Sequence, residues 1–445
     1  MEGLIMTAQI LLSLSILVAV HEFGHLLTAK YFGMRVEQFS IGFPPKIWSF
    51  KKGDTEYAFS AIPLGGYVKI SGMIDESLDT ETMNQAPQPW EFRSKPAWQR
   101  LIVMLGGIIV NVFVGMLIFT LLTFIYGDEY FPKDKVNANG GIYAMELAEQ
   151  IGLKTGDQIV KINGQDFDDF QQTSKPDILL TQDAYYTVVR DGKEIRIDIP
   201  ANFIESFSDK SKAASFVMPR IPAIVGEVAK ETIAAKVGLQ VDDRFLQVDG
   251  MAVKYQDEVN AIVKSGKRDS ISFQIERAGS ILSYKENFKD KDAIGFRAKQ
   301  WDDSMINTIT YSFGESLILG PERAFNVIFV QLKAFKKIFS GDLSLGKSLS
   351  GPIGIAEAFG GNWNWQRFWS LTGLLSMVLA FMNLLPIPAL DGGHVVFLLY
   401  EMISGRKPSD KFLENAQKVG MVLLLTLMVF VFGNDIWKLI EAKFF

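Results

Sequence analysis

Four long segments of the chain consist of apolar and uncharged residues only. They are Gly3 to Val20, Leu101 to Gly127, Phe368 to Leu390 and Val419 to Asn434. Because a helix needs roughly 20 apolar residues to cross the hydrocarbon core of a bilayer, each segment predicts a transmembrane helix. The first lacks a basic start and a small-residue cleavage pattern, so we expect it to be retained rather than removed as a signal peptide.

Three shorter runs between the first two spans alternate apolar and polar residues. They are Val36 to Phe43, Thr55 to Ile62 and Tyr67 to Ser71, separated by Gly-Asp and Leu-Gly-Gly turns. Alternation with a period of two is typical of strands. We therefore predict a small antiparallel sheet, which could be a solvated hairpin or could enter the bilayer.

The long polar segment between the second and third spans contains an internal repeat. Residues Ala148 to Gly164 recur 86 positions later as Ala234 to Gly250. Each copy predicts a helix ending at glycine, a turn with aspartate, and a strand closed by Asn-Gly or Asp-Gly. Asp242 replaces the turn glycine Gly156 of the first copy, so we expect that turn to differ.

After the second copy, apolar residues recur at helical spacing with lysines among them. This pattern predicts an amphipathic helix, either on the outer membrane surface or packed under the second copy. The apolar residues are Phe325, Ile328, Phe329, Leu332, Phe335 and Phe339.

Charge gives the predicted spans an orientation. Nine Lys and Arg residues lie from Lys30 to Arg100 and four lie from Arg406 to Lys418, whereas the carboxyl tail has two and the residues before the first span have none. Because positive residues favour the cytoplasmic side, both termini and the long insert should be extracytoplasmic. A net charge of −5 without a basic run excludes nucleic-acid binding, and the absence of cysteine excludes disulfides and thiolate metal sites.

The chain has three histidines, at positions 21, 25 and 394. The first two belong to His21-Glu22-Phe23-Gly24-His25, an HExxH pattern that places two imidazoles one helical turn apart on one face, as a tetrahedral zinc requires. The carboxylate of Glu22 could take a proton from water and return it to a leaving amine. The alternative is a hydrogen-bonded histidine pair at a helix end, which is disfavoured because uncompensated polar groups near hydrocarbon are costly.

A catalytic zinc needs a third protein ligand and one open position. The predicted orientation brings the inner ends of the first and third spans to the same depth, which leaves Asp391 or His394 as the candidate. Pro386 and Pro388 break the helix before them, and the freed backbone is tolerable only where it lines protein or water. Taken alone, the segment could be an ordinary helix terminus with a cytoplasmic turn.

The motifs HEFGH in the first span and NLLPIPALDGGH in the third closely resemble the site-2 protease family of intramembrane zinc metalloproteases. The resemblance is closest to the regulator-of-sigma-E (RseP) branch, and it covers nearly the whole chain. It implies that His21, His25 and Asp391 bind Zn²⁺. It further implies that Glu22 is the general base and that Asn383 helps to hold the substrate backbone or the transition state. His394 is then not a ligand.

The same resemblance implies tandem PDZ domains in the insert, a membrane-re-entrant β element, and a place in the bacterial inner membrane. The implied substrates are single-pass membrane proteins already trimmed by another protease, such as anti-sigma factors and remnant signal peptides. The PDZ domains would bind peptides or exclude bulky substrates, or they would be spacers without a working groove. Ile108 and Pro44 depart from the proline and glycine common in relatives, which puts local packing in doubt rather than the reaction.

We therefore expect a polytopic α-helical membrane protein with about four transmembrane helices, a re-entrant β element and two inserted α+β PDZ domains. The expected transmembrane helices are 1–30, 98–127, 365–391 and 418–440. The expected connecting regions are the cytoplasmic-side segment 31–97 with the β element, PDZ domains at 128–215 and 216–300, an amphipathic helix and re-entry segment at 301–364, and a cytoplasmic loop at 392–417.

Two other functions stay open. A catalytically silent membrane scaffold could recruit partners through its PDZ pair, but it would not need a base beside two metal ligands. A membrane-anchored zinc protease acting on soluble substrates would hold its metal outside the span, whereas eighteen uncharged residues run directly into His21.

Overall fold

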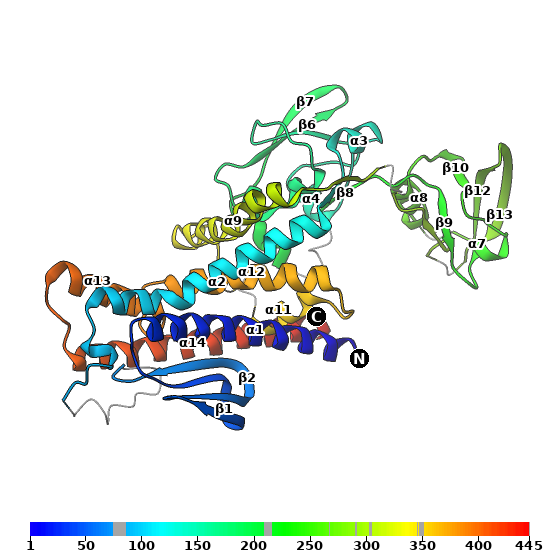
Figure 1. Cartoon of the computed structure of the whole chain (residues 1–445). Coiled ribbons are helices and arrows are strands. Elements are labelled where there is room, and N and C mark those ends of the chain that lie inside the picture. Colours follow the sequence, from blue (N-terminus) through cyan, green and yellow to red (C-terminus); the bar gives the residue numbers. More distant parts are fainter. Residues whose placement is uncertain are drawn as a thin grey trace. The chain divides into compact units, whose positions relative to one another are not determined.

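The chain forms two compact units in a computed structural model. The structure describes residues 1–73, 86–208, 216–266, 268–289, 292–301, 305–344, 346 and 351–444. The first unit comprises Met1–Gly127 and Thr310–Phe445, and the second comprises Asp128–Ile309. The first unit is mainly helical and the second is built from short strands and helices (Figure 1).

The four predicted spans are confirmed as helices long and apolar enough to cross a membrane. They belong to α1 (Glu2–Tyr31), α2 (Ala97–Tyr126), α12 (Trp365–Leu384) and α14 (Asp410–Phe444). Many of their large apolar side chains are exposed. In a membrane protein such side chains face lipid, because lipid tails are as apolar as the side chains themselves.

The third span ends earlier than the apolar pattern indicates. Helix α12 stops at Leu384, because Pro386 and Pro388 cannot continue the hydrogen-bond ladder, and α13 (Asp391–Ser404) starts after the break. Much of the expected loop 392–417 is therefore helical. Pattern reasoning missed α13 because a 14-residue helix is too short to register as a span.

Helix α2 is packed by α1, α12, α13 and a further long helix, α9 (Phe313–Phe339). Small residues permit the close approaches. A Cβ at Gly106 of α2 would lie 2.7 Å from the carbonyl oxygen of Gly24 on α1. At the start of α2, Arg100 forms an ion pair with Glu401 of α13. This contact ties α13 to the centre of the bundle.

The amphipathic helix is confirmed as α9, and its small residues lie against α2. Ser316, Gly320 and Ala324 are buried at four-residue spacing, and a Cβ at Gly320 would lie 2.5 Å from Thr120 Cα. Small residues at this spacing let helices approach closely in membranes. Further along, the rings of Phe335 and Phe381 lie 5.6 Å apart. Placement of α9 on the outer membrane surface stays a prediction. A shorter helix, α11 (Pro352–Phe359), packs against α1 and α14.

The predicted β element is confirmed, with longer strands than expected. Strands β1 (Val36–Lys52) and β2 (Thr55–Ile70) pair, and the Leu-Gly-Gly sequence lies within β2 rather than between two strands. Both strands are irregular, so that Ser40 pairs with Ala58 and also with Tyr67. A short helix, η2 (Phe92–Ser94), follows before α2.

The second unit contains the two repeat copies, each with its own hydrophobic core. The first copy has a three-stranded sheet in the order β5-β6-β7, and the second has a four-stranded sheet in the order β11-β10-β12-β13. The elements of the first copy are β3 (Asp128–Tyr130), α3 (Lys133–Ala138), β4 (Ile142–Ala144), α4 (Glu146–Gln150), β5 (Gln158–Ile162), η3 (Phe170–Ser174), α5 (Pro176–Leu179), β6 (Tyr185–Arg190), β7 (Lys193–Asp198), η4 (Phe203–Ser208) and β8 (Val217–Pro219). Those of the second are β9 (Val225–Val228), α7 (Ile233–Lys236), β10 (Arg244–Val248), β11 (Met251–Ala252), α8 (Gln256–Lys264), β12 (Ser270–Arg277), β13 (Ser280–Asn287) and β14 (Phe296–Ala298), after which β15 (Asn307–Ile309) pairs with β3.

Each copy of the repeat contains an equivalent ion pair with a buried aspartate. Asp157 accepts two hydrogen bonds of 2.7 Å from Arg190, and Asp243 accepts equivalent bonds of 2.7 and 2.6 Å from Arg277. Contrary to expectation, Asp242 keeps the left-handed backbone conformation of the equivalent glycine. Its φ is 72°, and that of Gly156 is 94°. Aspartate tolerates this conformation better than most residues with a side chain.

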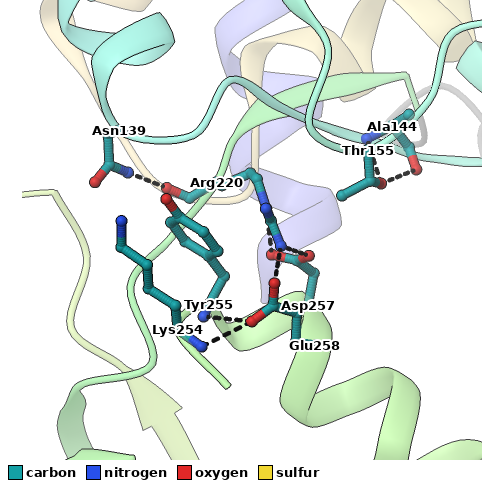
Figure 2. A network of polar contacts seen from close by, with 8 residues as sticks. All are labelled: Asn139, Ala144, Thr155, Arg220, Lys254, Tyr255, Asp257 and Glu258. Carbon is teal, nitrogen blue, oxygen red and sulfur yellow. Dashed lines mark hydrogen bonds and ion pairs between the residues drawn. The ribbon is translucent and has the colours of Figure 1, made fainter. Parts of the chain in front are cut away.

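A polar network joins the two copies (Figure 2). Arg220, which follows β8, donates 2.6 and 3.2 Å hydrogen bonds to Asp257 and a 2.7 Å bond to Glu258, both on α8. Its guanidinium lies 3.7 Å from the ring centroid of Tyr255, and its carbonyl accepts a 2.8 Å bond from the Asn139 side chain. The network thus connects helix α8 of the second copy to the first copy.

Candidate metal centre

The HExxH helix and the start of α13 meet at one point. His21 and His25 are buried one turn apart on α1, with their Nε2 atoms 3.2 Å apart. Asp391 is the first residue of α13, and its Oδ2 lies 3.2 Å from His21 Nε2 and 3.3 Å from His25 Nε2. Two clusters separated by hundreds of residues therefore come together, as the predicted depths required.

The dimensions of this triangle fit zinc. Bonds of about 2.0–2.1 Å in tetrahedral geometry put neighbouring ligand atoms about 3.3 Å apart, and the observed separations are 3.2 to 3.3 Å. The Oδ2 atom of Asp391 is buried and has no hydrogen-bond partner among the described residues. A buried carboxylate oxygen without a donor is costly in isolation, whereas a cation at the triangle would satisfy it.

The Nδ1 atom of each imidazole, which faces away from the triangle, also has a polar neighbour. His25 Nδ1 lies 2.8 Å from the carbonyl oxygen of Val103, so Nδ1 carries the proton and Nε2 presents a lone pair toward the triangle. His21 Nδ1 lies 3.1 Å from the side-chain nitrogen Nδ2 of Asn111 on α2, and the side-chain oxygen of Asn111 is buried with no hydrogen-bond partner among the described residues. Sequence reasoning assigned Asn111 no role. The available signal was an amide side chain within an otherwise apolar span.

Glu22 and Asn383 face the same cavity as the triangle. The cavity has a volume of about 710 Å³, and both residues line it. The backbone N–H of Val68 on β2 donates to the Glu22 carboxylate. Asn383, just before the end of α12, has its amide 3.2 Å from His21 Nε2. All five predicted site residues therefore lie together.

His394 also lines the cavity, but it stands apart from the triangle. Among the described residues, the group able to hold a metal consists of His21, His25 and Asp391. Of the two candidates for a third ligand, Asp391 is the one that belongs to this group.

The final segment of β2 forms one wall of the cavity. Residues 65–70 line it, as do Asn383 of α12 and Gln417 of α14. In the part of the chain that the structure describes, residues 66–70 pair with residues 36–41 alone. The other edge of this strand segment is therefore directed to the cavity side rather than to a further strand.

Known proteins match this chain over most of its length. The model of peptidase family M50 matches residues 9–427. A regulator of sigma E protease from Haemophilus influenzae is 30% identical, covering 96% of this chain and 98% of its own length. A putative zinc metalloprotease from Vibrio cholerae is 30% identical with the same coverage, and the regulator of sigma-E protease RseP from Escherichia coli is 28% identical, covering 97% and 98%. The chain belongs to peptidase family M50, the site-2 protease family, and is a zinc metalloprotease.

Proposed function

We propose that this zinc metalloprotease cuts peptide bonds of single-pass membrane proteins within the bilayer. The supporting observation is the position of the triangle of His21, His25 and Asp391, which is buried among helices apolar enough to span a membrane. A protease for soluble substrates would place its metal outside such helices.

His21, His25 and Asp391 would hold the zinc, which when bound supplies Lewis-acid activation of water and of the substrate carbonyl. Glu22 takes the proton from the attacking water and later gives it to the leaving amine. The Val68 N–H holds the Glu22 carboxylate in place by its hydrogen bond. Asn383, whose side-chain nitrogen lies 3.2 Å from His21 Nε2, is placed to bind the substrate backbone beside the metal.

The edge of β2 supports a way of presenting the substrate. A helical segment hides its peptide bonds in its own hydrogen-bond ladder, so it must unwind before cleavage. Residues 66–70 line the cavity and are paired on one side, and an extended substrate can add to such an edge through main-chain hydrogen bonds. The β element then acts as a membrane-re-entrant substrate clamp.

The insert is proposed to be a tandem of PDZ domains on the extracytoplasmic side of the bacterial inner membrane. The second copy has a cavity of about 170 Å³ between α8 and residues 292–296, lined by Val259, Val263, Ile294 and Phe296 among others. This arrangement suits an extended peptide. In the first copy, the corresponding segment is the shorter α5 (Pro176–Leu179), which favours a spacer role there.

Relatives named regulators of sigma E protease favour anti-sigma factors as substrates, and remnant signal peptides have the same single-span character. Prior trimming of the outer domain by another protease would let such substrates pass the insert. A catalytically silent PDZ scaffold is the competing proposal, but such a scaffold needs no ordered metal triangle.

The test compares wild type with Glu22→Gln on a membrane-embedded model substrate, with zinc quantified in both. We expect zinc to be retained and cleavage abolished, because the amide keeps the shape and loses the base. Undiminished cleavage would remove Glu22 from the mechanism, and cleavage of soluble peptides alone would favour the membrane-anchored alternative.

The third ligand is tested by zinc content. Asp391→Ala should lower zinc occupancy far more than His394→Ala, since Asp391 Oδ2 lies 3.2 and 3.3 Å from the two imidazole Nε2 atoms. The reverse order would overturn the assignment.

A further inference from the structure

Asn111 is a fully buried amide in the centre of the bundle. Its side-chain nitrogen Nδ2 is placed 3.1 Å from His21 Nδ1, while its side-chain oxygen is buried with no hydrogen-bond partner among the described residues. Its backbone carbonyl accepts a 2.8 Å hydrogen bond from Ser376 on α12. One residue of α2 therefore links the HExxH helix α1 to the helix that carries Asn383. A polar side chain this deep in an apolar span is costly unless it has a specific partner.

The protonation of His21 decides which atom of the amide faces it. A metal at Nε2 requires the lone pair of Nε2, so the ring proton must sit on Nδ1. Nδ1–H needs an acceptor, and the only acceptor on the Asn111 side chain is its oxygen. The oxygen and nitrogen of an amide are interchangeable by rotation, and the hydrogen-bond network is what assigns them.

We propose that Asn111 is a positioning residue that accepts the Nδ1–H of His21 through its side-chain oxygen and so aims the Nε2 lone pair at the metal. This inference rests on the proposed metal site. Asn111 would then act on His21 as the Val103 carbonyl acts on His25, where it accepts the Nδ1–H hydrogen bond. Both outer partners come from α2, so this helix sets the orientation of both imidazoles.

The rotation placed in the structure, with the amide nitrogen toward His21 Nδ1, makes a different prediction. If the Asn111 nitrogen donated to His21 Nδ1, the proton would sit on Nε2 and the ring could not bind a metal there. Aspartate at position 111 accepts but cannot donate, so Asn111→Asp separates the two arrangements. Asn111→Leu has a similar volume and can do neither.

The experiment measures zinc affinity of the full-length protein in detergent by competition with a chelator. We expect Asn111→Leu to weaken zinc binding by roughly 10- to 100-fold, the usual effect of losing such a partner. Asn111→Asp should stay within about threefold of wild type or bind more tightly. Thr123→Val is the matched control, because Thr123 is buried on the same helix and its hydroxyl has no hydrogen-bond partner among the described residues; it should leave affinity unchanged.

Wild-type affinity in Asn111→Leu, or equal weakening in the Asp and Leu variants, would overturn the proposal. If Asn111→Leu does not fold, a large loss of affinity in Asn111→Asp alone still contradicts it. His21→Ala and His25→Ala report on the metal site separately. Zinc retained by those variants would refute the proposed site, whereas zinc lost there but unaffected by position 111 would refute this inference alone.

Discussion

Gly107 offers the sharpest test of how the metal triangle is built. This residue of α2 lies directly against the two imidazoles. A Cβ at Gly107 would stand 2.5 Å from His25 Nε2 and 2.6 Å from His21 Cε1. Gly107→Ala therefore places a methyl group in space that both candidate ligands occupy.

The required movement can be worked from these distances. Carbon contacts are favourable at about 3.5 Å or more, so the imidazoles or α2 must move by about 1 Å. Metal–ligand distances tolerate only about 0.2 Å. A displacement of about 1 Å at a reacting centre costs on the order of 100-fold, and overpacking costs about 1–3 kcal/mol of stability. We expect zinc affinity and cleavage each to fall by at least about 100-fold, with the helical content kept.

Chelator competition and cleavage of a membrane-embedded substrate measure both effects. Gly115→Ala is the matched control, because its Cβ on the same helix would meet Met377 Sδ at 2.5 Å. A methionine side chain is flexible and can move away, so we expect less than about a threefold change. Wild-type zinc binding by Gly107→Ala, or equal damage from Gly115→Ala, would refute this account of the site.

Two further predictions concern the second unit. Arg220→Met leaves the carboxylate of Asp257, which is 9% exposed, without its partner. Breaking such a pair costs about 3–5 kcal/mol, so calorimetry should show the unit melting roughly 6–20 °C lower, with partial recovery on adding Asp257→Leu. No recovery would contradict the ion-pair explanation. Burial raises the pKa of Asp243, but hydrogen bonds from Arg277 and the Gln240 N–H outweigh it, and the net pKa is lowered. The stabilisation is then complete above the unfolded-state pKa of about 3.9 and is lost as pH falls through the lower folded-state pKa. Melting temperatures measured from pH 6 down should fall less steeply below about pH 4 in Asp243→Asn than in wild type; parallel curves would contradict the shift.

Local sequence patterns were sufficient for the features that depend on local physics. The four spans follow from apolar length, because a bilayer core imposes the same minimum on any crossing helix. The pair His21 and His25 follows from helical periodicity, and the repeated aspartate turns follow from the sequence repeat. Charge bias gave the matching depth of two distant clusters, which meet in the structure.

Tertiary structure decided what depends on packing between distant segments. The residues alone left Asp391 and His394 open, and the packing of α13 on α2 brings Asp391 within 3.2 and 3.3 Å of the two imidazoles. Gly107 and Asn111 lie against the imidazoles because α1 and α2 pack together across a sequence separation that no local pattern encodes. Helix propensity acts over a few neighbouring residues. The orientation of an imidazole lone pair, in contrast, depends on side chains from separate helices that meet within about 3 Å.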